Sequence, residues 1–302
     1  MSSPLRSPEN EVAIVMRTFD RPLFLARAVQ SVLKQSYQSW RLIIVNSGAL
    51  DDVQAVMNHA SGEFRGRVVV IQSVHRGGLQ CIGCLTNEGL AAAEESRWVT
   101  VLDDDDTWHS SFLARAVERL TVQKRHPDVR GVAAQSMVLN EVLENGALRQ
   151  VDAKPFNPGL RRIELMSLAA SNLFTGNAFV YEREVLSQIG LYSETLPVLD
   201  DWDFNLRFAL KFDIDVISEP LANYHRRMAT SDLGRAHQNT SHELHDFIYN
   251  KIVNDHLRAD LARGLTGLGP LMAVSSRLRA VSEKIGKIEQ RTRARASLPK
   301  EG

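Results

Sequence analysis

The sequence predicts an α/β fold of the Rossmann-like type, with a mostly parallel central sheet flanked by helices. Short, continuously apolar runs alternate with amphipathic stretches through the first half of the chain. Continuous rather than alternating hydrophobicity is typical of strands that are buried on both faces of a sheet. The regular alternation of the two patterns indicates parallel strands that are joined by crossover helices.

The first half reads as strand, helix, strand, helix, strand. Leu25, Val29 and Val32 recur at helical spacing behind Pro22, a residue that suits the first turn of a helix. A glycine-punctuated stretch, 77–90, is expected to merge into a short helical run. The expected elements, in order, are strand 12–16, helix 22–35, strand 42–45, helix 51–60, strand 67–72, helical run 90–95, strand 98–102 and helix 110–124.

The pattern becomes less regular beyond residue 130, and the last part of the chain is predicted to be helical. A polar hairpin or loop is expected around Asn145 and Gly146. We place a boundary near Asn239, so that a larger domain, 1–238, is followed by a helical extension, 239–302. The expected elements here are strand 131–139, strand 179–181, helix 183–189, helix 201–211, strand 215–217 and helix 243–264.

The composition is that of an ordinary folded protein and offers no global electrostatic attraction. Of the 302 residues, 44% are hydrophobic, and 36 Lys and Arg balance 36 Asp and Glu. We therefore expect no nucleic-acid partner. The polar segment from Met1 to Asn10 has no apolar signal core, and no run of eighteen apolar residues occurs. The cytoplasm is accordingly the expected compartment.

Cys81 and Cys84 are the only cysteines, and their C-x-x-C spacing is compatible with redox chemistry or with half of a zinc site. A structural zinc site needs two further ligands at suitable spacing. The favoured interpretation is two buried or half-buried thiols.

Four consecutive carboxylates, Asp103 to Asp106, directly follow the apolar run 98–102. Two carboxylates about 4 Å apart repel by roughly 4 kcal/mol at an effective dielectric constant of about 20, so a positive charge is expected among them. Oxygen-only ligands favour Mg²⁺ or Mn²⁺, ions that proteins commonly share with substrate phosphates. The alternative is a solvated acidic loop. The position at the carboxyl end of a buried strand favours a binding site.

In their order along the chain, these motifs resemble those of a family 2 glycosyltransferase with the GT-A fold. The similarity extends from about residue 12 to residue 231. It rests on segments 12–22, 31–37, 42–48, 87–89, 102–108 and 199–207. The resemblance implies that 1–238 is a GT-A domain, with a nucleotide-binding half at about 11–125 and an acceptor half at about 126–238.

The resemblance also implies a nucleotide-sugar donor whose diphosphate is bridged by Mg²⁺ or Mn²⁺. Asp103 and Asp105 form an Asp-x-Asp motif and are the expected metal ligands. Asp103 also belongs to the expected donor site, where Asp104 would face the ribose. Two further residues, His225 and Arg226, would either reach the diphosphate or lie on an ordinary basic surface. The other residues expected to bind the nucleotide sugar are Thr18, Phe19, Asp20, Arg21, Asn46 and Asn87.

Asp201 is the candidate general base, with Asp200 beside it. An acceptor hydroxyl must lose a proton as it attacks, and a positioned carboxylate can take that proton. Both residues precede a helix, whose free N–H groups favour an ionised carboxylate, so helix capping is the structural alternative. A single carboxylate base suits a single displacement that inverts the anomeric centre.

Asn46, Ser47 and Thr86 depart from the family pattern. The carbonyl of Asn46 can accept a hydrogen bond from the ring N–H of uracil or thymine, which favours a UDP- or dTDP-sugar donor. The predicted function is metal-dependent, inverting transfer of a sugar to a glycan or lipid-linked glycan acceptor in surface polysaccharide biosynthesis. One alternative is a catalytically impaired binding module. Another is a sugar nucleotidyltransferase, which would need a glycine-rich phosphate loop where segment 17–22 stands.

The tail from Arg277 to Gly302 is basic, with eight Lys and Arg against three Glu. Such a tail could hold the protein at the inner face of an anionic membrane, near a lipid-linked acceptor. A solvated tail and an oligomerisation helix are the alternatives. The preceding apolar stretch, 261–274, is interrupted by glycine and proline, so we do not predict a spanning helix.

Overall fold

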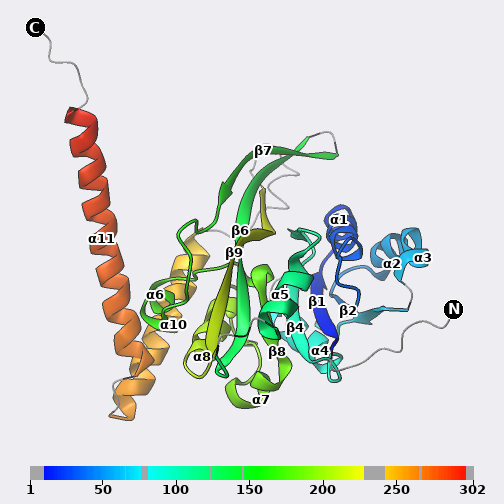
Figure 1. The fold of residues 1–302 in the computed structure, drawn as a ribbon, viewed down its shortest axis with the longest axis horizontal. Coiled ribbons are helices and arrows are strands. Elements are labelled where there is room, and N and C mark those ends of the chain that lie inside the picture. Colours follow the sequence, from blue (N-terminus) through cyan, green and yellow to red (C-terminus); the bar gives the residue numbers. More distant parts are fainter. Residues whose placement is uncertain are drawn as a thin grey trace, which may run out of the picture.

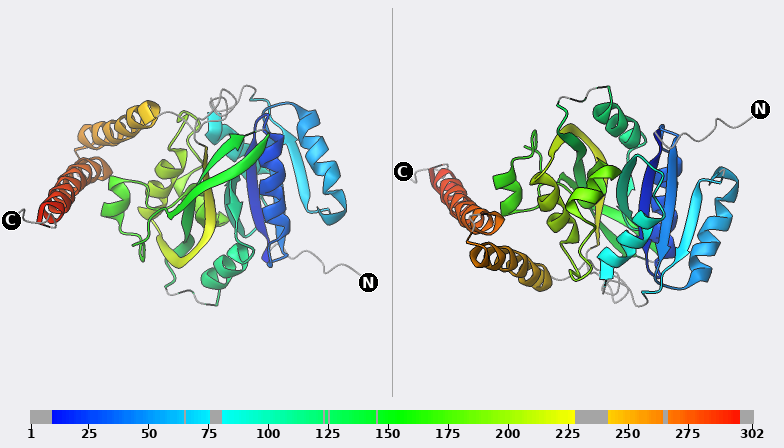
Figure 2. Two further views of the ribbon diagram at one scale, coloured as in Figure 1. Left: turned by 90° about the horizontal axis from the view of Figure 1, so that it is seen from above. Right: turned by 90° about the horizontal axis from the view of Figure 1, so that it is seen from below.

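The computed structural model describes residues 10–296, apart from 65, 76–80, 123, 125, 145, 228–241, 265 and 266. A nine-stranded sheet runs through the described part of the chain in the order β3-β2-β1-β4-β8-β6-β9-β5, and β7 pairs with β6 (Figure 1). Helices cover both faces of this sheet, whereas α10 and α11 stand at one end of it (Figure 2). The predicted α/β fold is confirmed.

The first half of the sheet is entirely parallel, as the sequence predicts. The register places Arg17 of β1 beside Asp103 of β4, so the loops that follow these two strands share one edge of the sheet. The strands are β1 (Val12–Thr18), β2 (Trp40–Asn46), β3 (Val68–Gln72) and β4 (Trp98–Asp103). The helices are α1 (Pro22–Leu33), α2 (Leu50–His59), α3 (Ser61–Phe64), α4 (Ile82–Ala91) and α5 (Phe112–Leu120).

The second half of the sheet mixes directions, because β8 lies antiparallel between β4 and β6 while β9 runs parallel to β6. The short strand expected at 215–217 becomes the 15-residue β9, which stays paired with β6 through several register shifts. The strands are β5 (Thr107–Trp108), β6 (Val129–Glu144), β7 (Ala147–Pro155), β8 (Phe179–Glu182) and β9 (Asp213–Arg227). The helices are α6 (Leu165–Ala170), η3 (Gly176–Ala178), η4 (Arg183–Val185), α7 (Leu186–Ile189) and α8 (Asp200–Ala209).

Strand β1 shows why its sequence is apolar throughout. Ile14 and Met16 face a core with α1 and α5, whereas Ala13 and Val15 face a second core with α4 and α8. Successive side chains of a strand point to opposite faces, so a strand between two helical layers needs apolar residues at every position.

The C-terminal region forms two helices, α10 (His242–Ala262) and α11 (Leu268–Ala296). Ile248 of α10 and Met272 of α11 are buried against Trp202 of α8, in a third core cluster. The expected helical extension is thus observed, and most of the expected basic tail belongs to α11. The boundary predicted near Asn239 lies outside the described residues. No helix within the described ranges is long and apolar enough to cross a membrane.

Two local expectations between residues 77 and 90 were wrong. The helical run was expected at 90–95, whereas helix α4 spans Ile82–Ala91 and includes two of the glycines of this stretch; residues 77–80 lie outside the described residues. Gly89 is there for close packing, because a Cβ at this position would overlap the Val15 side chain of β1. Cys81 and Cys84, at the start of this helix, form a disulfide rather than two thiols. Their Cα atoms are 5.2 Å apart, a distance that a disulfide can span.

The close packing of α4 on β1 predicts that Gly89→Ala destabilises the fold. Overpacking of a filled core costs about 1–3 kcal/mol, so the midpoint of urea unfolding should fall. Gly62→Ala is the matched control, because a Cβ on this glycine of α3 meets nothing within 4 Å. Equal unfolding midpoints for the two variants would contradict this account of α4.

Candidate functional site

A cavity of about 430 Å³ lies at the carboxyl ends of β1 and β4. This is the edge where open α/β sheets bind their ligands. The two predicted acidic motifs meet here, since the cavity is lined by Asp103 and Asp106 from one and by Asp200 and Asp201 from the other.

Arg17 connects the two acidic motifs. Its Nε donates to Asp103 Oδ1 at 2.9 Å, and its Nη1 donates to Asp200 Oδ2 at 3.2 Å. Burial alone would lower the pKa of Arg17, but Asp103 and Asp200 outweigh this effect and raise the pKa above its usual value. Sequence reasoning did not place Arg17 in the site. The available signal was a charged residue next to the end of a buried, apolar strand.

Asp104 is completely buried beneath the loop that follows β1. The Thr18 hydroxyl donates to Asp104 Oδ2 at 2.7 Å, and Arg21 Nη2 donates to Oδ1 at 2.5 Å. Burial raises the pKa of Asp104 to about 7, although Arg21 acts in the opposite direction. Asp104 therefore ties the acidic loop to the start of α1, and its contact with a ribose stays a prediction.

Asp105 forms ion pairs with two arginines that are far apart in the sequence, Arg21 before α1 and Arg227 at the end of β9. Arg21 Nη1 lies 3.1 Å from Asp105 Oδ2, and Arg227 Nη2 lies 2.5 Å from the same oxygen. Burial alone would raise the pKa of Asp105, but the two guanidinium groups lower it below its usual value. Burial, together with the charges of Asp105 and Asp103, raises the pKa of Asp106 well above its usual range.

The sequence predicted a positive charge among these carboxylates. The guanidinium groups of Arg17, Arg21 and Arg227 provide such charges. Repulsion among the carboxylates therefore no longer requires a metal ion, but the carboxylate oxygens remain suitable metal ligands. Carboxylate oxygens of Asp103, Asp105 and Asp106 all lie within 4.8 Å of one another. A set of oxygen ligands alone fits Mg²⁺ or Mn²⁺. Asp103 is the most accessible of the three, with 42% of its side chain exposed.

Asp201 lies in the first turn of α8, across the cavity from the acidic loop. Its Oδ1 accepts from its neighbour, the Trp202 N–H, at 2.8 Å, and its Oδ2 accepts from Asn172 Nδ2 at 2.8 Å. Burial, together with the charge of Asp200, raises the pKa of Asp201 to about 7. Asn172 is a site residue that sequence reasoning missed. Its own carbonyl accepts from Asn205 Nδ2 at 3.1 Å, which fixes its orientation.

Strand β9 separates two residues that the sequence placed together. Arg226 lines the cavity, as Tyr224 does, whereas His225 is buried on the opposite face of the strand. His225 Nδ1 lies 2.7 Å from Glu141 Oε1, and its Nε2 lies 2.9 Å from Thr107 Oγ1. Arg226 thus faces the cavity, while both ring nitrogens of His225 are occupied by protein groups. Contact of Arg226 with a diphosphate stays a prediction.

The turns after β1 and β2 are joined to each other. Asp20 adopts a left-handed conformation, with φ of 48°, and its Oδ1 accepts from the Ala49 N–H at 2.7 Å. Asn46 is fully buried, and its amide bonds both the backbone of Gly48 and the side chain of Gln72. Phe19, in the turn after β1, is exposed. The roles of these residues in binding a base stay predictions.

Asn87 joins α4 to the segment that precedes α8. Its Nδ2 donates to Tyr192 O at 3.0 Å, and its Oδ1 accepts from Tyr192 N at 3.0 Å. Tyr192 itself lines the cavity, so Asn87 positions part of the cavity wall rather than lining it. Direct contact of Asn87 with a nucleotide sugar stays a prediction.

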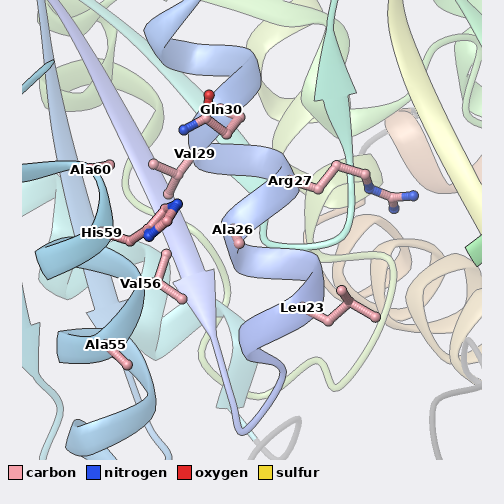
Figure 3. A pocket seen from close by; sticks show the side chains of 9 residues that line it. All are labelled: Leu23, Ala26, Arg27, Val29, Gln30, Ala55, Val56, His59 and Ala60. Carbon is pink, nitrogen blue, oxygen red and sulfur yellow. The ribbon is translucent and has the colours of Figure 1, made fainter. Parts of the chain in front are cut away.

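A second hollow, of about 770 Å³, lies between α1 and α2. Figure 3 shows Val29, Val56 and His59 between the two helices, while Arg27 points away from α2. Arg27 instead pairs with Glu141 at 2.7 Å. None of the carboxylates described above lines this hollow, so the cavity beside Arg17 is the candidate site.

The bridge made by Arg17 predicts a large effect of Arg17→Met. Removal of one partner of a buried ion pair costs about 3–5 kcal/mol, because the remaining charge is left without compensation. We expect the free energy of unfolding in urea to fall by this amount. Arg115→Met is the control, since Arg115 forms exposed ion pairs with Glu118 and Glu219 and should leave stability unchanged. Equal stability of the Arg17→Met variant and the unsubstituted protein would contradict the bridging role.

Solved structures of other proteins share this fold. The structure of S. aureus TarS 1-349 in complex with UDP-GlcNAc matches with a TM-score of 0.54 at 16% identity, over 76% of this chain and 62% of that one. The mannosyltransferase PcManGT from Pyrobaculum calidifontis, in complex with GDP-Man and Mn²⁺, matches with a TM-score of 0.53 at 16% identity, over 96% and 81%. These similarities confirm the GT-A fold.

Sequence comparisons point the same way. An uncharacterized glycosyltransferase of Nostoc sp. (strain PCC 7120), alr2836, is 27% identical over 188 residues, which are 59% of this chain. The match spans about half of that relative, 53% of its length. The model of the family described as glycosyltransferase like family 2 matches residues 8–233. By this match over most of its length, the chain belongs to the family 2 glycosyltransferases.

Proposed function

We propose that this protein transfers a sugar from a nucleoside diphosphate donor to a hydroxyl group of a glycan, with inversion and with the help of a divalent ion. One observation carries the proposal. The acidic loop and the Asp200–Asp201 pair face one cavity, and Arg17 holds them together. Such a cavity can hold a diphosphate near one wall and an attacking hydroxyl near the other.

The donor side of the cavity contains the residues that would meet the diphosphate. Asp103 and Asp105, with Asp106 beside them, would hold Mg²⁺ or Mn²⁺. When bound, the ion would neutralise charge that accumulates on the leaving diphosphate. Arg226 faces the same cavity and offers a second positive charge to the phosphate oxygens.

The acceptor side contains the proton acceptor. Asp201 would take the proton from the acceptor hydroxyl as its oxygen attacks the anomeric carbon. Asn172 and the backbone N–H of Trp202 hold the two carboxylate oxygens of Asp201 in place. Its pKa of about 7 is near neutral pH, which suits a group that must gain and lose a proton in each cycle. Direct attack on the donor, in one displacement, inverts the anomeric centre.

The donor is proposed to be a UDP- or dTDP-sugar, and the acceptor a glycan of a surface polysaccharide. The preference for a pyrimidine base follows from the sequence position of Asn46 at the carboxyl end of β2. To accept from a base, Asn46 Oδ1 would have to exchange its present hydrogen bond from Gly48 N–H, at 3.1 Å, for one from the base. An amide carbonyl matches the single ring N–H of uracil or thymine. The acceptor assignment follows from the family resemblance.

Calorimetric titration with UDP, dTDP and GDP, in Mn²⁺ and then in EDTA, tests the donor site. We expect tightest binding of UDP or dTDP, with loss of affinity in EDTA and on the order of 100-fold weaker metal-dependent binding in Asp103→Asn. Asp103 is chosen because it is the most exposed of the three ligands. Asp51→Asn, on the exposed start of α2, is the control. Absence of any nucleotide binding in the unsubstituted protein would favour a degenerate scaffold and contradict the assignment of the donor site.

The base assignment predicts that Asp201→Asn lowers kcat by about 10²- to 10⁴-fold and leaves nucleotide affinity unchanged. Because the pKa of Asp201 is raised to about 7, the carboxyl is protonated and inactive at lower pH. The kcat of the unsubstituted protein should therefore rise as pH increases through about 7. Asp203→Asn is the control, since Asp203 lies on the same helix but pairs with Arg207 at 2.8 Å. An unchanged kcat in Asp201→Asn would refute the assignment.

A further inference from the structure

Helix α11 carries a stripe of exposed apolar side chains. Val274, Leu278, Val281, Ile285 and Ile288 are each between 52% and 62% exposed. They follow one another at alternating intervals of four and three residues, which is the heptad spacing of a coiled-coil seam. The half-buried Leu271 extends the same pattern by one position, so the seam covers three heptads, with Leu271, Leu278 and Ile285 at a and Val274, Val281 and Ile288 at d.

The rest of the chain covers a different face of α11. Met272 and Ser275 are buried, and Arg279 Nη1 donates to Ala170 O at 3.2 Å. The far half of α11 projects away from the body of the molecule (Figure 1), and almost every side chain from residue 280 to residue 289 is exposed. Figure 2, seen from above and from below, shows α11 at the outer end of the molecule, beside α10. Leu271 packs against the third core cluster, whereas the apolar stripe from Val274 to Ile288 is not part of the core of this chain.

We propose that α11 packs along this stripe against the α11 helices of other copies of the chain, in a parallel coiled coil. A helix that projects into water receives little stabilisation from propensity alone and depends on packing of its apolar face. The spacing selects the partner. A narrow a/d stripe with a period of 3.5 residues is specific to helix–helix seams, whereas helices that lie on membranes present broader apolar faces, often with aromatic anchors.

The charges beside the seam select the parallel direction. In the heptad set by the apolar residues, Lys284 is at g and Glu289 is at e. Parallel helices place g of one chain opposite e of the next heptad on its neighbour, which brings Lys284 to Glu289 of another copy. Antiparallel helices would instead bring g positions together, and the described g positions, Arg277 and Lys284, are both basic.

The residues of the seam also indicate how many helices it joins. All three d positions are β-branched, and two of the three a positions are Leu. Leu at a with β-branched residues at d favours three or four strands over two. We therefore expect a small, closed assembly in which catalytic domains are tethered at one end.

Light scattering during gel filtration of the full chain tests the seam. We expect a mass about three or four times that of one chain. The double variant Ile285→Ser/Ile288→Ser should elute as a monomer with unchanged UDP affinity, because both side chains are far from the nucleotide site. Lys287→Ser, on the exposed face of the same helix, is the control and should keep the larger mass. A monomeric unsubstituted protein would overturn the proposal.

Exchange of the flanking charges tests the direction. Lys284→Glu alone should weaken the assembly at least several-fold, since it places a second carboxylate against Glu289 of the next copy. Adding Glu289→Lys to this variant should restore the assembly, because the carboxylate introduced at position 284 of one copy would then face the ammonium group introduced at position 289 of the next. Strengthening by Lys284→Glu alone would show antiparallel helices and overturn the parallel arrangement. The chain could instead stay monomeric and co-float with phosphatidylglycerol vesicles in a manner that requires α11. That result would show that α11 contacts membranes and would overturn the proposal of self-association.

Discussion

The buried guanidinium of Arg17, held between Asp103 and Asp200, is the interaction on which the site depends. Arg17 lies on β1, the strand between β2 and β4, so its position is set by a parallel sheet packed on both faces. Arg17 thereby bridges two acidic segments that belong to different halves of the domain. Without it, carboxylates in a low-dielectric cavity would repel each other and the cavity would not keep its shape.

Arginines also decide what each carboxylate of the acidic loop can do. Asp104 accepts hydrogen bonds from Thr18 and Arg21, and Asp105 accepts hydrogen bonds from Arg21 and Arg227. Both contacts are structural, because they fasten the loop to α1 and to the end of β9. Asp103 is half exposed to the cavity, and this accessibility makes it the group best placed to meet an ion or a phosphate. The four carboxylates of the loop therefore differ in how accessible they are to a ligand and are not four equivalent metal ligands.

The raised pKa of Asp201 suits the role of proton acceptor that we propose for it. Burial and the charge of Asp200 both disfavour ionisation of Asp201, while Asn172 and the helix N-terminus keep its carboxylate oriented. A carboxylate that is oriented but reluctant to ionise is a stronger base than one in water. A structural contact and the proposed role as a base are compatible for Asp201, since the hydrogen bond from Trp202 N–H in the first turn of α8 also orients its carboxylate.

The order of strands and helices, the fold class and the two acidic segments could be predicted from the sequence alone, because they follow from hydrophobic periodicity and from residues adjacent in the chain. The partners of the acidic residues could not. Arg17 and Asp200 are 183 residues apart, and Arg227 and Asp105 are 122 apart. Whether Arg226 or His225 faces the cavity depends on the pleat and register of β9, and the close packing of α4 on β1 depends on the space that Gly89 leaves for Val15. Local patterns determine which elements form, whereas only the packing of distant segments decides which side chains meet.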